Sequence, residues 1–311
     1  MILLPDDYFQ VRNTKIYTPK AKKAFKIVAL GDVHLSDLVS DKKLSSIKYQ
    51  LERESGDYYV FLGDLIDEPE ELLKENIRRE LKGLIKASAS LGKTMVILGS
   101  HDFVSEIGQY PSFSYDEDFW AEISSYDNVY LLNGDYYIDD FVYFMGYTQP
   151  LDYYYDKNDF GKIDQVAFYK DFVQREYLYR NVPQNVPSVC LIHSPEFVNS
   201  SSNLELFRDY DLLVSGHDHD GCVPFGLGNG NRGIISPKKE LFPNNVRGVR
   251  ILGNDVILII SGGIVKIQNC APKMLHWLNH LCPMQLDTIE FFDDENCFVE
   301  SQKRFVYSKK I

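Results

Sequence analysis

Five of the seven histidines follow short apolar runs, at points where the chain leaves a predicted β-strand. They are His34, His101, His193, His217 and His219. Two aspartates, Asp32 and Asp64, occupy the same kind of position. Imidazole and carboxylate groups without thiolates suit first-row metals such as Mn, Fe, Zn, Ni and Co. These residues therefore predict a metal centre built from strand-ending turns.

The number of candidate ligands bears on how many ions such a centre would hold. Aspartate and histidine are common in turns for capping reasons, so each position alone is a weak signal. Together, the five histidines and two aspartates exceed what one ion takes. An aspartate that bridges two ions about 3.5–4 Å apart would use all of them. We therefore expect two ions rather than one.

Other metal-ligating side chains fit simpler interpretations. His276 and His280 lie four residues apart on a predicted C-terminal helix, with no acidic residue between them, and are interpreted as structural or surface residues. The five cysteines are scattered and form no C-x-x-C pair. Neither a disulfide framework nor a zinc-thiolate site is indicated.

The elements that would position the candidate ligands are apolar strands followed by helices. Strands are predicted at residues 27–30, 58–62, 94–98, 189–192 and 211–214, each ending in a turn that carries candidate ligands. Helical spacing of apolar residues predicts helices over 43–54 and from about Pro69. Three strand–turn–helix repeats near the N-terminus indicate an α/β fold. In open α/β sheets the ends of the strands are where active sites lie.

The rest of the chain is less regular, but no linker divides it. We expect one domain over 1–311, with an N-terminal hairpin in 1–24, a motif-bearing core in 25–220 and a C-terminal loop, hairpin and helix in 221–311. The N-terminal hairpin is placed over 8–18, around Asn13-Thr14. Other expected elements are a helix over 116–125, strands at 129–132 and 141–145, a loop at 149–162 with Tyr153-Tyr154-Tyr155, a helix over 164–180, a hairpin at 249–261, a helix over 273–281 and a strand at 286–292.

Composition and net charge argue against some classes of function. The chain has 311 residues, 44% of them hydrophobic, and a formal net charge of −12. That negative charge disfavours binding to the phosphate backbone of nucleic acid, so nucleic acid is not the expected substrate. No run approaches the roughly 18 apolar residues of a membrane helix, and the N-terminal run is too short for a signal peptide. We expect a cytoplasmic protein; the oligomeric state is left open.

The ordered set of turns resembles the calcineurin-like metallophosphoesterase superfamily. The resemblance spans 26–220 and is carried by Gly31-Asp32-Val33-His34, Gly63-Asp64-Leu65-Ile66-Asp67, Gly99-Ser100-His101-Asp102, His193 and Gly216-His217-Asp218-His219. The flanking segments are similar to a bacterial single-domain branch that often carries an N-terminal membrane anchor, which we expect this chain to lack. The resemblance implies a four-layer α/β/β/α sandwich with two mixed β-sheets.

The resemblance also implies a role for each residue. One ion would be held by Asp32, His34 and His219, and the second by His193 and His217. Asp64 would bridge the two ions. His101 would act as an acid beside the leaving group or hold a phosphoryl oxygen, with Asp67 as its orienting partner. Asp102, Asp218 and Asp37 are interpreted as capping or supporting residues.

One position departs from the family pattern. Ser100 stands where the family has asparagine, so a hydroxyl replaces a longer amide carbonyl. Serine could ligate directly, act through a water or not ligate at all. We expect the second ion to bind less tightly than the first.

The implied function is a dinuclear-metal phosphoesterase that hydrolyses phosphomonoesters or phosphodiesters through a metal-bound hydroxide. The alternatives are a phospholipid or lipid-linked pyrophosphate hydrolase at a membrane surface, and a metal-depleted protein-binding scaffold. The glycine-rich loop at 226–233 could present Arg232 to a phosphate. It lacks the Gly-Lys-Ser/Thr of a P-loop, so an ordinary loop is the simpler interpretation.

Overall fold

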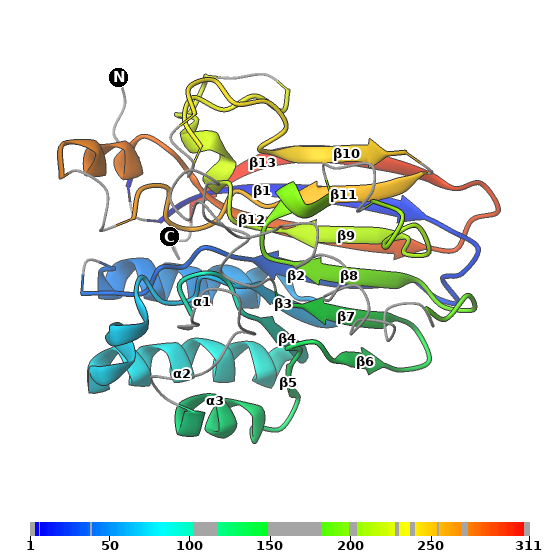
Figure 1. Cartoon of the computed structure of the whole chain (residues 1–311), viewed down its shortest axis with the longest axis horizontal. Coiled ribbons are helices and arrows are strands. Elements are labelled where there is room, and N and C mark those ends of the chain that lie inside the picture. Colours follow the sequence, from blue (N-terminus) through cyan, green and yellow to red (C-terminus); the bar gives the residue numbers. More distant parts are fainter. Residues whose placement is uncertain are drawn as a thin grey trace, which may run out of the picture.

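Two mixed β-sheets form the centre of the fold in a computed structural model of the chain (Figure 1). The structure describes residues 4–5, 7–37, 39–102, 117–148, 182–198, 204–227, 230–236, 240–253, 255–268 and 273–307. The first sheet has the order β13 (Phe298–Tyr307), β1 (Tyr8–Tyr17), β12 (Met284–Phe292), β2 (Phe25–Leu30), β3 (Tyr58–Leu62), β4 (Lys93–Ile97) and β5 (Val129–Leu131). The second has the order β10 (Gly248–Leu252), β11 (Val256–Ile260), β9 (Leu212–Ser215), β8 (Ser188–Ile192), β7 (Tyr143–Tyr147) and β6 (Tyr136–Ile138).

The strands that precede the candidate ligands are parallel and lie at the centre of each sheet. β2, β3, β4 and β5 pair in parallel in the first sheet, as do β7, β8, β9 and β11 in the second. Except for β5, which is an edge strand of the first sheet, these strands are covered on both faces, which explains their apolar sequences. Because parallel strands end at the same edge of a sheet, the turns that follow them are brought together.

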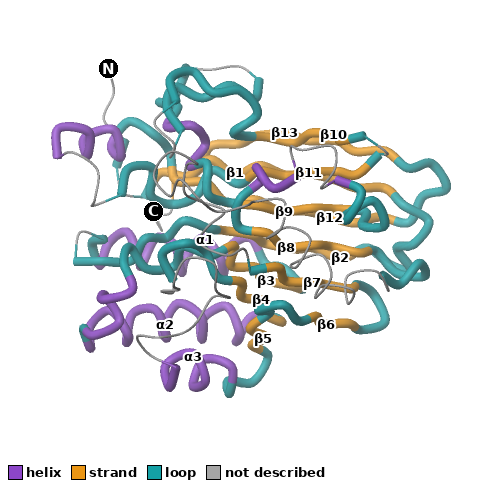
Figure 2. Tube along the Cα trace, in the orientation of Figure 1, coloured by secondary structure: helices purple, strands orange, loops and turns teal. Residues whose placement is uncertain are grey.

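Helices cover the outer face of the first sheet beside β2–β5 (Figure 2). They are α1 (Asp41–Glu54), α2 (Glu75–Leu91) and α3 (Glu117–Ser124), with a 3₁₀ turn η1 (Pro69–Leu73) before α2. Ser40 caps α1 by accepting a hydrogen bond from the Lys43 amide at 3.2 Å. Leu44, Ile47 and Leu51 follow at helical spacing and are buried against the sheet.

A second apolar core lies between the two sheets. Ile27, Val60 and Ile97 of the first sheet pack in one cluster with Val189 and Val214 of the second. A third cluster covers the outer face of the second sheet and includes Phe207 and Tyr210. The predicted α/β sandwich with two mixed sheets is therefore confirmed. The predicted helix over 164–180 and the loop tyrosines 153–155 lie outside the described residues.

The prediction of an N-terminal hairpin over 8–18 is wrong. Those residues form the single strand β1, which pairs in parallel with β12 and antiparallel with β13. Asn13, placed in the turn by its sequence, instead donates from Nδ2 to Thr288 Oγ1 at 3.1 Å and to Glu290 Oε1 at 2.7 Å. The local preference of Asn13 for a turn is thus outweighed by hydrogen bonds to partners 275 and 277 positions away in the sequence. Strand β13, which completes this edge, was not predicted.

The C-terminal elements otherwise follow the predictions. β10 and β11 form the expected hairpin, and the predicted helix over 273–281 is the 3₁₀ helix η6 (Lys273–His280). Two further 3₁₀ turns, η4 (Pro195–Val198) and η5 (His219–Cys222), follow β8 and β9. Among the described residues, no helix combines the length and apolar character needed to cross a bilayer. The single-domain boundaries and the cytoplasmic location stay predictions.

Candidate metal centre

Five candidate ligands share an unusual backbone conformation. Left-handed φ values occur at Asp32 (51°), His34 (44°), Asp64 (50°), His217 (70°) and His219 (49°). Residues other than glycine rarely adopt this region, and they do so mainly where surrounding structure enforces it at functional sites. The turns after β2, β3 and β9 therefore hold these side chains in imposed directions.

Two groups of three ligand-type side chains converge in the structure. One group is Asp32, His34 and His219, and the other is Asp64, His193 and His217; all six residues are buried. Within each group the candidate ligand atoms lie within 4.8 Å of one another. A third group of His34, Asp64 and His101 overlaps both, so that Asp64 lies between the two clusters.

Main-chain carbonyl groups orient two of the histidine rings. His219 Nδ1 lies 2.6 Å from the Val265 carbonyl oxygen, and His193 Nδ1 lies 2.7 Å from the Leu62 carbonyl oxygen. A ring nitrogen that donates to a carbonyl leaves the other nitrogen as the free acceptor, which is the arrangement of metal-ligating histidines. His193 Nε2 is 2.9 Å from Asp64 Oδ2.

Glycines leave the space that the two aspartate carboxylates occupy. A Cβ at Gly99 would lie 2.3 Å from Asp64 Oδ1, and a Cβ at Gly263 would lie 2.6 Å from Asp32 Oδ2. Gly263 also has a φ of 69°, which disfavours any other residue. Gly99 belongs to the predicted motif, whereas Gly263 was not identified from the sequence.

Asp102 holds the turns together from behind the site. Its Oδ1 accepts hydrogen bonds from the amides of Leu65 (2.7 Å) and Ile66 (3.2 Å), and its Oδ2 accepts one from the Gly99 amide at 2.8 Å. The turn after β4 is thereby tied to the turn after β3. Asp102 therefore has the supporting position expected for it, while Asp37 is exposed and ion-paired with Lys74 at 2.7 Å.

Burial and mutual charge shift the pKa values of the second group. Burial would raise the pKa of the Asp64 carboxyl, but the charges of His193, His101 and His34 together outweigh burial and hold the pKa well below its usual range. Burial would lower the pKa of His193, but Asp64 raises it to about 9. Only a neutral imidazole can bind a metal, so metal binding by His193 would release a proton.

His101 is oriented by Asp67, but through the main chain. His101 Nδ1 is hydrogen-bonded to the Asp67 backbone carbonyl oxygen. The Asp67 carboxylate points elsewhere, with Oδ1 3.4 Å from His34 Nδ1. The structure thus brings these two residues together as expected, with the carbonyl in place of the carboxylate.

Ser100 lies beside the shared aspartate. Its hydroxyl Oγ is 3.4 Å from Asp64 Oδ1 and 3.5 Å from Oδ2, at the long limit of a hydrogen bond. The neighbouring His101 amide donates to Asp64 Oδ1 at 2.9 Å. The short hydroxyl therefore adjoins the second group without a close contact to its carboxylate.

The structure adds one residue to the site and leaves one outside it. The amide nitrogen Nε2 of Gln268 lies 3.3 Å from His219 Nε2 and 3.4 Å from His34 Nε2. Nothing in the sequence marks Gln268, which is 234 positions from His34. Arg232 is exposed, its Nε donates to Asn244 Oδ1 at 3.0 Å, and it belongs to neither ligand group.

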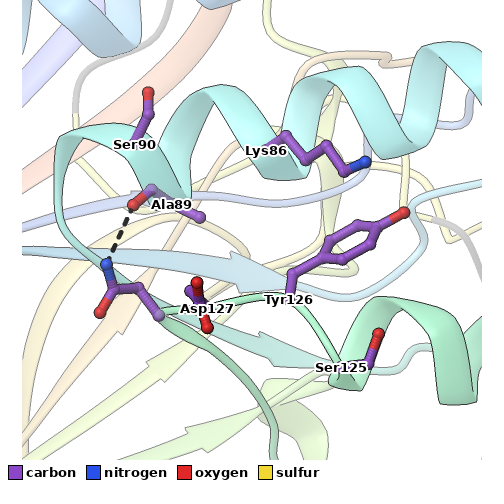
Figure 3. A pocket seen from close by; sticks show the side chains of 7 residues that line it. Lys86, Ala89, Ser90, Ser125, Tyr126 and Asp127 are labelled. Atoms are coloured by element: carbon purple, nitrogen blue, oxygen red, sulfur yellow. Dashed lines mark hydrogen bonds between the residues drawn. The ribbon is translucent and has the colours of Figure 1, made fainter.

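A surface pocket elsewhere contains none of the predicted site residues. It has a volume of about 430 Å³ and lies between the end of α2 and the turn after α3 (Figure 3). Lys86 from α2 lies over the Tyr126 ring, 4.2 Å from its centroid, and Asn128 Nδ2 donates to the Ala89 carbonyl. The side chains that line it include no group of metal ligands within the described residues.

Comparisons with known proteins agree with this geometry. The model of the calcineurin-like phosphoesterase family matches residues 25–221, which include all the candidate ligands. An uncharacterized metallophosphoesterase of Campylobacter jejuni is 24% identical over 255 residues, covering 82% of this chain and 57% of that protein. One of Aquifex aeolicus is 24% identical over 260 residues, covering 83% of this chain and 84% of that protein. This chain therefore spans little more than half the length of the Campylobacter protein.

Among solved structures, a dimetal phosphatase from Danio rerio aligns with 13% identity and a TM-score of 0.47, covering 92% of this chain and 99% of that chain. The phosphopantetheinyl hydrolase of Mycobacterium tuberculosis aligns with 11% identity and a TM-score of 0.43, covering 81% of this chain and 94% of that chain.

Proposed function

The chain belongs to the calcineurin-like phosphoesterase family; from this premise we propose that it is a metal-dependent hydrolase, which cleaves phosphate monoesters or diesters with two first-row metal ions. The observation that carries the proposal is the position of Asp64 between two buried clusters of ligand-type side chains. A carboxylate is the side chain best suited to bridge two cations, because each of its oxygens can bind a different ion.

The residues present fit a pair of ions. Both clusters combine carboxylate and imidazole donors, which are ligands of Mn, Fe, Zn, Ni and Co, and both are buried. Asp32, His34 and His219 would hold one ion, and His193 and His217 would hold the other, with Asp64 shared. When bound, such a pair polarises phosphoryl oxygens and lowers the pKa of a coordinated water.

We propose that His101 faces the leaving group of a bound substrate. Its Nδ1 is hydrogen-bonded to the Asp67 carbonyl, which fixes the ring and leaves Nε2 as the group free to face a substrate. A protonated imidazole there can donate a proton to a departing alkoxide or a hydrogen bond to a phosphoryl oxygen. His101 is only partly buried, which suits a residue that meets substrate.

The proposal is tested with Asp64→Asn. The substitution preserves shape but removes the charge that would bind both ions, so we expect loss of hydrolysis of p-nitrophenyl esters and loss of bound metal. Elemental analysis of protein purified without chelator measures the metal, and circular dichroism checks that the fold is retained. We expect the wild-type protein to regain activity with Mn²⁺ after chelation.

Asp37→Asn is the matched control, because Asp37 is exposed and belongs to neither cluster. It should retain both metal and activity. Wild-type turnover by Asp64→Asn would refute the assignment, and a metal-free wild-type protein that stays inactive after Mn²⁺ is added would refute the function.

A further inference from the structure

A second pocket lies beside the edge of the first sheet, against the segment that follows η5. Its volume is about 300 Å³. Among the described residues that line it, the charged side chains are Arg247 and Lys303, accompanied by the polar Gln10. The part of the lining that the structure describes includes no acidic side chain, although the whole chain carries a net charge of −12. No residue of the two metal-ligand clusters lines it either.

Arg247 is a buried cation whose guanidinium group is only partly hydrogen-bonded. It is only 3% exposed, and its Nε lies 2.9 Å from Asp220 Oδ1. Its Nη1 has no hydrogen-bond partner within the described part of the chain. A buried N–H group without a partner carries a desolvation cost, which a bound acceptor would remove.

Other cations reinforce the positive field at this position. Lys303 on β13 lies opposite Arg12 on β1 in the antiparallel register. Arg12 is itself paired with Asp287 and donates to the Ile260 carbonyl oxygen at 2.7 Å, so Asp287 is already neutralised. Among the described residues Lys303 has no ion pair, and partial burial and the nearby Arg247 lower its pKa. Within the described residues, Asp220 and Asp287 therefore lie among a larger set of cations, which includes Arg247, Arg12 and Lys303.

The rest of the lining is apolar and partly aromatic. Phe225 and Phe305 meet edge to face with ring centroids 4.9 Å apart, and they remain 39% and 44% exposed. Leu227 beside them is 61% exposed. Aromatic rings in this arrangement offer a surface for a further ring or an alkyl group.

We propose that this pocket binds a small organic anion, in which a phosphate or carboxylate group meets Arg247 and Lys303 and an aromatic group packs on Phe225 and Phe305. The guanidinium fork of arginine matches the paired oxygens of either anionic group. The volume suits a molecule of one ring and one anionic group, because it lies at the lower end of ligand pockets. The ligand would bind independently of the hydrolytic reaction.

The test is isothermal titration calorimetry on the metal-loaded protein. The probes are phenylphosphonate, benzoate and inorganic phosphate. We expect phenylphosphonate or benzoate to bind, and Lys303→Gln to weaken that binding about tenfold through loss of a charge-assisted hydrogen bond. Arg247→Lys keeps the charge but removes the fork, so it should also weaken binding. A preference between the first two probes identifies the anionic group.

Lys86→Gln is the matched control, because it removes the same charge from the unrelated pocket of Figure 3 and should leave binding unchanged. Inorganic phosphate should bind more weakly than phenylphosphonate at this pocket because it lacks the ring. Absence of binding by both aromatic probes would overturn the proposal. So would binding that survives Lys303→Gln and is lost in Asp64→Asn, because it would belong to the metal centre. Hydrolytic activity should be unaffected by Lys303→Gln.

Discussion

Asp67 takes part in the candidate site through two different groups. Its backbone carbonyl is hydrogen-bonded to His101 Nδ1, while its carboxylate oxygen lies 3.4 Å from His34 Nδ1. One residue thereby orients the proposed acid and supports a proposed ligand. Substitution of the Asp67 side chain should therefore act mainly through His34, since the carbonyl that holds His101 is retained in any variant.

His101→Gln tests the proposed acid. An acid matters most when the leaving group is a strong base, so we expect kcat to fall by roughly 100-fold on an alkyl phosphate ester. The decrease should be much smaller on p-nitrophenyl phosphate, whose leaving group needs no proton. Steady-state kinetics on both substrates measure the ratio. Glu68→Gln, which changes a charge 3.9 Å from the same ring, is the control. An equal loss on both substrates would contradict the role as an acid.

Ser100→Asn tests the expected weakness of the second ion. The Ser100 hydroxyl lies at 3.4 Å from the shared carboxylate, and a longer amide carbonyl would reach further towards a bound cation. We expect this variant to bind the second ion more tightly in calorimetric metal titration. Ser100→Ala, which removes the hydroxyl without adding a carbonyl, should not. Equal affinities for the second ion in wild type and Ser100→Asn would rule out this explanation.

At the scale of elements, β1 connects the two ends of the chain. It runs parallel to β12 and antiparallel to β13, so this strand lies between two strands from the other end of the sequence, and Asn13 bonds to Thr288, 275 positions away. Arg12 on this strand is 1% exposed and pairs with Asp287 on β12. It also reaches the Ile260 carbonyl oxygen on β11 of the second sheet.

Arg12→Met should lower the free energy of unfolding by about 3–5 kcal/mol, because it leaves the buried Asp287 carboxylate unpaired. Urea denaturation followed by circular dichroism measures the change. Arg12→Met combined with Asp287→Leu removes both charges and should be less destabilised than the single variant. A single variant within about 1 kcal/mol of wild type would show that the pair contributes little.

At the scale of the whole molecule, the two sheets are joined by polar contacts at both ends. Arg12 connects them at one end, and Asp139 connects them at the other. The Asp139 carboxylate accepts hydrogen bonds from Lys93 on β4 of the first sheet at 2.8 Å and from the Tyr137 hydroxyl on β6 of the second sheet at 2.9 Å. Tyr58 on β3 donates to the same oxygen at 2.7 Å. The carboxylate therefore holds residues of both sheets.

These contacts predict a dependence of stability on pH. Burial would raise the pKa of Asp139, but Lys93 and the other donors lower it from 3.8 to about 2. A depressed pKa means that the stabilisation is present above pH 4 and is lost as the pH falls towards 2. At pH 7 we expect Asp139→Asn to be less stable by roughly 2 kcal/mol. Urea denaturation at several pH values should show this difference vanish near pH 2, whereas the exposed neighbour variant Asp140→Asn should match wild type throughout.

Local pattern in the sequence was sufficient to find the candidate ligands. An apolar run followed by Gly-Asp-Val-His or Gly-His-Asp-His predicts both a strand and a turn with metal-ligating side chains, because both depend only on adjacent residues. Parallel strands bring their ends to one edge, so the ligand turns met as expected. The mixed-sheet sandwich, however, came from resemblance to a family rather than from periodicity, which indicated only an α/β fold.

Tertiary structure decided everything that depends on residues far apart in the chain. It made Asn13 part of a strand, placed Gln268 beside His34 and His219, and chose the carbonyl of Asp67 rather than its carboxylate as the partner of His101. Each outcome is a competition between a local preference and a specific partner whose position is fixed only when the sheets assemble. The residue types thus determined the chemistry available to this protein, and the packing of its two sheets determined which atoms meet.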